Sequence, residues 1–235
     1  MLDKLKKELR ENGDKERAEH SKRFFKTGKG EYGEGDVFLG LKVPDEREIV
    51  KKYDLDFEDV QKLLDSDIHE ERFAGLLILI SRYKNKKADD ELRREIFDFY
   101  LKNAKKGRIN NWDLVDLSCH KVVGAYLVDK DRDVLYELVK GNLWEKRIAI
   151  ISCFAFIKNN DFKDALKISE LLFKDKHDLI HKAVGWVLRE VGKKNQSVEE
   201  DFLKKHYKTM PRTMLRYAIE RFDEGLRKKY LGGEV

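Results

Sequence analysis

The chain has 235 residues, of which 40% are charged, and its formal net charge is +5. This length can bury a sizeable core, and so mild a basic excess permits nucleic-acid binding without indicating it. Two lone cysteines exclude a disulfide framework, and no apolar run approaches the roughly 18 residues that a membrane span needs, so we expect a cytoplasmic protein without a signal peptide.

The amino-terminal segment from Leu2 to His20 is charged almost all round and predicts one solvated helix; a DNA-contacting arm is the alternative. It is followed by Gly28-x-Gly30-x-x-Gly33, a spacing that cradles phosphates in nucleotide-binding proteins. That fingerprint needs a strand before it and a helix start directly after it. The sequence offers neither, so we expect no nucleotide cofactor. We expect a flexible connection whose near end carries Phe24 and which closes over DNA.

Apolar residues recur at helical spacing in most of the chain. The clearest runs span residues 72–80, 145–157 and 180–191, and only two prolines occur. Alternation typical of strands is hard to find, and hairpin signals are absent. The sequence therefore predicts an all-α fold.

The buried-looking helices share a layout in which a basic residue precedes small and then large apolar ones. Arg72, Arg147, Lys182 and Arg216 hold the basic position, at intervals of 75, 35 and 34 residues, and Trp112 falls in the middle of the long interval. A period of roughly 35–40 residues is typical of HEAT or armadillo repeats. We predict a right-handed α-solenoid with a concave basic groove; an ordinary bundle with solvated helix starts is the alternative.

No linker divides the chain, so we expect a single HEAT-like repeat domain over residues 1–235. Within it, residues 1–36 form the amino-terminal helices and the glycine-rich connection, residues 37–225 the repeats, and residues 226–235 a frayed tail. We expect a monomer.

The segment that begins at Asn110 is the most unusual in the chain. Asn111 can cap a helix that starts at Trp112, which places Trp112 and Asp116 on one helix face. Asp113 suits the first turn of that helix, whereas Asp116 lies one turn deeper. The alternative is that Trp112 belongs to the core and Asp116 to the surface.

A second aromatic residue strengthens the functional interpretation. Trp186 shares a helix face with Lys182 and Arg189, and Lys146 and Arg147 open the preceding predicted inner helix. Cations hold phosphates, and flat aromatic rings stack on bases or sugars. A carboxylate in such a groove repels phosphate, which favours a catalytic role beside a sugar.

Two further patterns are expected to be structural. His177 and His181 are spaced i, i+4, but a zinc site would need a third ligand, so we expect helix capping or phosphate contact and no metal. Cys119 and Cys153 fall in predicted buried helices and are expected to be small core residues.

In combination, these motifs resemble the DNA alkylation repair family of HEAT-like-repeat DNA glycosylases, the AlkD-like proteins. The matching pieces are Trp112-Asp-x-x-Asp116, Leu143-Trp144-x-x-Arg147, Lys182-Ala183-x-Gly185-Trp186-x-Leu188-Arg189 and Phe38-Leu39-Gly40-Leu41-x-Val43-Pro44. The resemblance runs from about Arg23 to Tyr217.

The resemblance implies removal of N3- and N7-alkylated purines from double-stranded DNA, without a cofactor. By position, Asp116 would be the catalytic carboxylate, Trp112 and Trp186 would flank the sugar and backbone of the lesion, and Arg147 would hold a phosphate. Phe24 matches an aromatic position that is often tyrosine, so stacking is expected there without the hydroxyl. The resemblance also implies that the lesion stays in the stack or is exposed to solvent.

Two other functions stay open. A solenoid that binds damaged or branched DNA without catalysis would release no base. A protein-binding scaffold, the commonest role of helical solenoids, would have no positive stripe and no affinity for DNA.

Overall fold

The protein is all-helical, as the sequence predicts. The computed structural model describes residues 1–235, and its only β-type pairing is an isolated bridge between Val37 and Ile68. No helix combines the length and the apolar character that crossing a membrane requires.

The chain divides into two compact units, Met1–Ser118 and Cys119–Val235, and helix α7 (Trp112–Tyr126) runs through the boundary. The expected single domain stays a prediction. The other helices of the first unit are α1 (Leu2–Glu11), α2 (Lys15–Phe24), α3 (Val43–Val50), α4 (Phe57–Leu64), α5 (His69–Lys84) and α6 (Asp90–Lys105).

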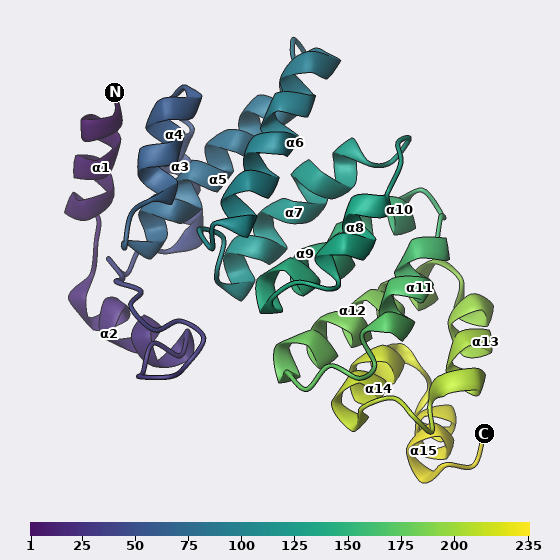
Figure 1. Ribbon diagram of the computed structural model, residues 1–235. Helices are drawn as coiled ribbons and strands as arrows, with labels where there is room; N and C mark the ends of the chain where they lie inside the picture. The colour runs from purple at the N-terminus through teal and green to yellow at the C-terminus, as the bar shows by residue number, and fades with distance from the viewer. The chain divides into compact units, whose positions relative to one another are not determined.

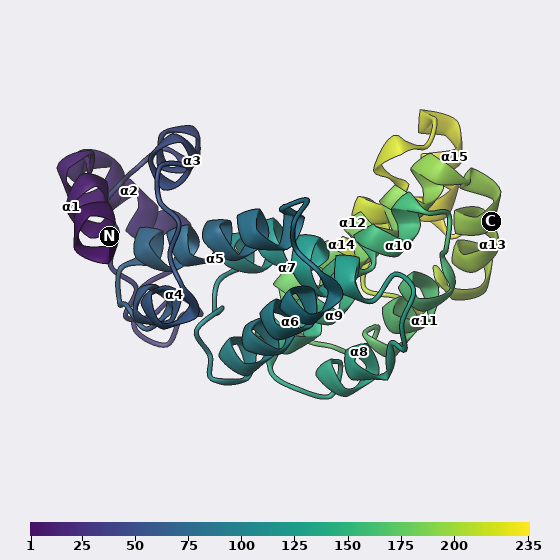
Figure 2. The ribbon, with the colours of Figure 1, turned by 90° about the horizontal axis from the view of Figure 1, so that it is seen from above.

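Helix α5 is the centre of the first unit. Helices α3 and α4 both pack against it, and Figure 2 shows them on either side of its beginning. Helix α1 packs against α3 and α5. The predicted helical run at 72–80 lies inside α5, most of whose residues are buried.

The amino-terminal segment differs from the expected single solvated helix. It forms two helices, α1 and α2, and Gly13 lies in the break between them. The side chain of Asp14 caps α2 by accepting the N–H of Arg17. Leu5 and Leu9 lie one turn apart and are fully buried. The expectation was wrong because two leucines suffice to anchor a helix whose other faces are charged.

The first turn of α5 carries four buried side chains, two of which fix the segments around it. Glu71 forms ion pairs with Lys6 (2.9 Å) and Arg10 (2.7 Å) of α1. Glu70 accepts the backbone N–H groups of Leu39 (2.9 Å) and Gly40 (2.8 Å). The start of α5 therefore holds both α1 and the segment that leads into α3.

The helices of the second unit gather around α12 (Asp178–Lys194), against which α9, α10, α11, α13 and α14 pack (Figure 1). The remaining elements are α8 (Asp133–Leu138), α9 (Leu143–Ser152), α10 (Phe154–Lys158), α11 (Lys163–Leu171), α13 (Gln196–His206), α14 (Arg212–Ala218), the 3-10 helix η1 (Ile219–Arg221) and α15 (Glu224–Gly232).

Two predicted elements need correction. The run at 145–157 is split at Cys153 into α9 and α10. The carboxyl-terminal residues, expected as a frayed tail, contribute to α15, whose Tyr230 is fully buried and packs edge-on against Tyr207. One large aromatic ring is enough to anchor this short helix.

Packing within the units is consistent with a stack of helical repeats. Helix α4 packs with α5, α8 with α9, and α11 with α12, while α9 and α14 both contact α12. Gly185 permits the close approach of α12 and α14, since a Cβ there would lie 2.5 Å from the carbonyl oxygen of Met214. The right-handed superhelix and the concave basic groove stay predictions.

The conformation and surroundings of Gly40 give a first testable prediction. Its φ is +83°, and a Cβ would lie 2.2 Å from the carbonyl oxygen of Asp14. Gly40→Ala should lower the free energy of unfolding by at least about 3 kcal/mol, because backbone strain and a backbone clash add. Gly30 is the control: its φ is +78°, with nothing within 4 Å of a Cβ. Gly30→Ala should cost only about 1 kcal/mol, and equal losses in urea unfolding would mean that the clash at Gly40 costs nothing.

Candidate functional site

The candidate catalytic helix begins where the sequence predicts. Helix α7 starts at Trp112, whose backbone N–H donates to the side-chain oxygen of Asn111 at 2.8 Å. Asn111 is fully buried, and its side-chain amide donates to Asp36 at 3.2 Å. The cap is thus fixed from both sides, which sets the direction in which α7 leaves its first turn.

Trp112 and Asp116 lie one turn apart on α7, and both are partly exposed. Trp112 is therefore not an enclosed core residue, and Asp116 does not stand fully in solvent. An indole and a carboxylate thus share one partly exposed helix face. Their catalytic roles stay a prediction.

Two adjacent aromatic residues at the end of α2 pack on Trp112. Phe25 stacks on it nearly parallel, with ring centres 5.3 Å apart and an angle of 17° between the planes. Phe24 meets it edge-on at 5.7 Å and is 56% exposed. The sequence assigned a role to Phe24 alone and missed Phe25, although the adjacent pair of phenylalanines was the available signal.

A buried charge cluster lies beneath these rings. His69, the first residue of α5, places Nε2 2.8 Å from Asp113 and Nδ1 3.3 Å from Asp36. Arg72 forms an ion pair with Asp36 at 2.6 Å. Because Arg72 is only 5% exposed and paired within the fold, it adds no charge to a DNA-facing stripe. Sequence reasoning missed this cluster of two carboxylates and two basic side chains.

The electrostatics of the cluster favour charged forms. Burial alone lowers the pKa of His69, but the charge of Asp113 and the hydrogen bonds to Asp113 and Asp36 raise it to about 9. Burial alone raises the pKa of Asp36, yet the hydrogen bond with His69 and the charge of Arg72 hold it below its ordinary value. At neutral pH, His69 is therefore a cation between two carboxylates.

The glycine-rich connection ends in this cluster. The N–H of Gly33 donates to the carbonyl oxygen of Lys26 at 3.0 Å, and the N–H of Gly28 donates to the side chain of Glu31 at 2.9 Å. The last residue of the segment is the buried Asp36. A segment expected as a flexible connection thus has internal hydrogen bonds and a fixed far end.

The candidate phosphate-binding cations belong to the second unit, on α9 and α12, which pack together. Arg147 is only 5% exposed and donates to the carbonyl oxygen of Leu179 at 2.6 Å. Its guanidinium therefore links α9 to the first turn of α12, although the sequence predicted a phosphate ligand there. The predicted surface that joins these cations to Trp112 stays a prediction.

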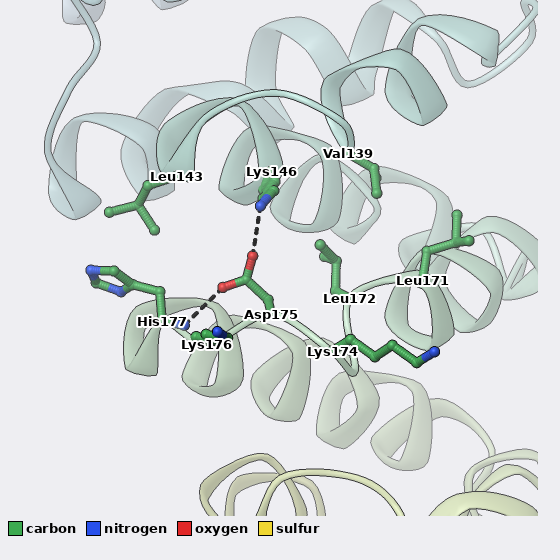
Figure 3. A pocket seen from close by; sticks show the side chains of 9 residues that line it. All are labelled: Val139, Leu143, Lys146, Leu171, Leu172, Lys174, Asp175, Lys176 and His177. Carbon is green, nitrogen blue, oxygen red and sulfur yellow. Dashed lines mark hydrogen bonds and ion pairs between the residues drawn. The ribbon is translucent and has the colours of Figure 1, made fainter.

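The other three cations are paired with carboxylates. Lys182 lies 2.6 Å from Asp178, and Arg189 pairs with Glu220. Lys146 lies 2.8 Å from Asp175 at the edge of a pocket of about 650 Å³ (Figure 3). Asp175 also accepts the backbone N–H of His177 at 2.8 Å. DNA would have to compete with these partners for each positive charge.

Trp186 is partly exposed and lines a second pocket of about 530 Å³. Its ring meets Phe154 edge-on at 4.7 Å, and its indole N–H donates to Glu190 at 3.2 Å. Lys193 and Lys194 also line this pocket. The pocket thus combines an aromatic face with cations, but these are not Lys182 and Arg189, which the sequence predicted beside Trp186.

The remaining candidates have structural roles. The side chain of His177 caps α12 by accepting the N–H of Leu179, and the ring of His181 bonds the carbonyl oxygen of Asp175, which confirms the predicted capping. No group of three His, Cys, Asp or Glu side chains could hold a metal ion. Cys119 and Cys153 are fully buried, as predicted, and burial raises the pKa of the Cys153 thiol.

Comparisons with known proteins agree with this fold. The chain is similar in fold to a solved structure, the predicted DNA alkylation repair enzyme from Enterococcus faecalis, with a TM-score of 0.67 and 15% identity over 91% of this chain and 98% of that chain. Curated proteins give no match. The sequence model of the DNA alkylation repair enzyme family matches residues 5–222. Because this match spans most of its length, the chain belongs to the DNA alkylation repair enzyme family, which implies a role in DNA repair and DNA as a partner.

Proposed function

We propose that this protein is a monofunctional DNA glycosylase that releases N3- and N7-alkylated purines from duplex DNA. The observation that carries the proposal is the pairing of Trp112 and Asp116 on one partly exposed face of α7, beside two phenylalanine rings. Membership of the DNA alkylation repair enzyme family supports alkylated DNA as the substrate.

The chemistry of the substrate explains why one carboxylate suffices. Alkylation at N3 or N7 leaves the purine positively charged, so the glycosidic bond is already weakened. When that bond breaks, its electron pair moves to the purine ring, and the base departs as a neutral molecule. No acid has to protonate the leaving group, and the reaction requires neither a metal nor a nucleotide cofactor.

Asp116 acts on the sugar in this mechanism. Its carboxylate lies beside the oxocarbenium-like ion that forms as the base leaves, and the opposite charge stabilises that transition state. Water then attacks the anomeric carbon, with Asp116 orienting it, and the proton passes to solvent. The products are the free base and an abasic site.

The aromatic residues divide the binding work. Phe25 stacks on one face of the Trp112 indole, which leaves the other face of the indole to contact the sugar and backbone of DNA. Phe24 is exposed and keeps one side available for stacking on DNA. Trp186 contributes a second aromatic face on the unit that also carries Arg147.

The first test is base release from duplex DNA that contains N3-methyladenine and N7-methylguanine. Asp116→Asn should slow release by roughly 10²–10³-fold, because the amide keeps the shape but loses the charge. Asp129→Asn, at an exposed position of the second unit, is the matched control and should leave the rate unchanged.

Two results would contradict the proposed chemistry: no release by the wild-type protein, or undiminished release by Asp116→Asn. Tight binding of damaged duplex without release would instead favour the non-catalytic DNA-binding protein. Absence of any DNA affinity at low salt would favour a protein-binding scaffold.

A second test concerns the exposed ring of Phe24. Phe24→Ala should weaken binding of methylated duplex by roughly 5–100-fold, because one stacking interaction is lost. The free energy of unfolding should change by less than about 1 kcal/mol, since the ring is mostly exposed. Fluorescence anisotropy and urea unfolding measure the two effects. A stability loss as large as the affinity loss would mean that Phe24 supports the fold and does not contact DNA.

A third test uses the ion pair between Lys182 and Asp178. Lys182→Gln should weaken DNA binding and reduce the slope of log K against log salt by about one, because one phosphate contact disappears. Asp178→Asn removes a carboxylate that competes for the same cation and should tighten binding by roughly 2–5-fold at low salt. If both variants bind like the wild type, Lys182 does not contact DNA.

A further inference from the structure

His69 occupies an unusual position under the candidate catalytic helix. Its ring centre lies 5.0 Å from that of Phe25, which in turn stacks on Trp112. Phe38 stacks on His69 at 4.7 Å and on Phe25 at 5.0 Å. The imidazole is therefore part of the aromatic stack that supports Trp112.

Both ring nitrogens of His69 face carboxylates. Nε2 lies 2.8 Å from Asp113 and Nδ1 lies 3.3 Å from Asp36, and the side chain of His69 is 4% exposed. A neutral imidazole has one N–H and could donate to only one of these carboxylates, leaving a lone pair facing the other. The imidazolium donates to both. The geometry therefore fits the charged ring and disfavours the neutral one.

The two carboxylates belong to segments that His69 joins. Asp113 is in the first turn of α7, one residue beyond Trp112 and three before Asp116. Asp36 ends the glycine-rich connection and also binds the cap residue Asn111. A charge on His69 thus acts at both the start of α7 and the segment that precedes Phe38.

We propose that His69 is a positioning residue: as an imidazolium bridging Asp36 and Asp113, it fixes the first turn of α7 and the stack that orients Trp112 and Asp116. Its effect on catalysis rests on the proposed function, whereas its effect on the orientation of Trp112 does not. Loss of the proton, or of the ring, should turn Trp112 and Asp116 away from the reactive geometry without removing the cations of the second unit.

The sign of the pH effect follows from the groups around the ring. Asp36 faces it from the connection, Asp113 from α7 and Arg72 from its own helix, and Asp113 also acts on the buried Glu46 of α3. Burial, followed by the charges of Glu70 and Asp113, raises the pKa of Glu46 well above its ordinary value and so favours its neutral form. The pKa of His69 is about 9, above its ordinary 6.5, so the imidazolium is present at neutral pH and the bridge is lost as the pH rises through about 9.

The orientation of Trp112 can be followed by its fluorescence. The chain has three tryptophans, so Trp144→Phe and Trp186→Phe together leave Trp112 as the only indole. Excitation at the red edge of the indole band avoids tyrosine. We expect the emission of this variant to titrate with a midpoint near pH 9, while circular dichroism shows an intact fold.

A second substitution separates positioning from simple packing. Asp113→Asn removes one of the two carboxylates and should lower the midpoint by about one to three pH units, because a neighbouring opposite charge raises a histidine pKa by that amount. Asp36→Asn should act in the same direction and replaces the first variant if that one does not fold. His206→Gln, in the second unit, is the control and should leave the midpoint unchanged.

A separate experiment compares the rate of base release with the affinity for DNA in the full chain. His69→Gln should slow single-turnover base release by roughly 10–100-fold, the effect of a small misplacement of reacting groups. Its Kd for methylated duplex should change by less than about twofold, because the phosphate-binding cations remain.

Three results would overturn the inference: no titration of Trp112 emission around pH 9, a midpoint that the aspartate variants leave unmoved, or a loss of rate in His69→Gln that matches the loss of affinity. Failure of the proposed function gives a different pattern. The wild-type protein would release no base, while the fluorescence titration would still report whether His69 holds Trp112.

Discussion

The ion pair between Asp36 and Arg72, 2.6 Å long and almost fully shielded from water, joins the glycine-rich connection to the first turn of α5. His69 adds a second bond to the same carboxylate and extends the cluster to α7. Buried pairs of this kind add little net stability, because desolvation offsets their attraction, but removing one partner costs about 3–5 kcal/mol. Within the amino-terminal unit, these contacts join the glycine-rich connection and the first turn of α5 to the start of α7.

This constraint matters because the candidate chemistry needs orientation more than it needs reactive groups. A cationic purine leaves readily once the sugar's developing charge is stabilised, so the position of a single carboxylate decides the rate. Asp116 is one turn from Trp112, and Trp112 is supported by Phe25. The aromatic stack and the buried charges thus act together on one helix turn. Phe24 differs from its neighbour by being exposed, which suits a contact with DNA.

In the second unit, three of the candidate phosphate-binding cations are paired with carboxylates of the same unit. Lys146, Lys182 and Arg189 are each paired with a carboxylate. The Lys182–Asp178 pair is exposed, and such a pair contributes roughly 0–1 kcal/mol, so a phosphate could displace this carboxylate at small cost. In the free protein these partners reduce the local positive field, which limits nonspecific attraction to DNA. Arg147 is different, because its buried guanidinium also links α9 to α12 through the carbonyl of Leu179.

The sequence by itself determined the helical class, the spacing of the basic positions and the cap at Asn111, because these depend on residues within a turn or two of one another. The resemblance of its motifs likewise indicated the family whose model matches residues 5–222. Only the tertiary structure revealed that Leu5 and Leu9 are buried, that Phe25 stacks on Trp112, and that His69 joins Asp36 to Asp113. These contacts join residues from 33 to 87 positions apart, or depend on which face of a highly charged helix meets the core. The local periodicity of the sequence does not indicate which distant residues pair. It also does not distinguish a buried charged residue from an exposed one.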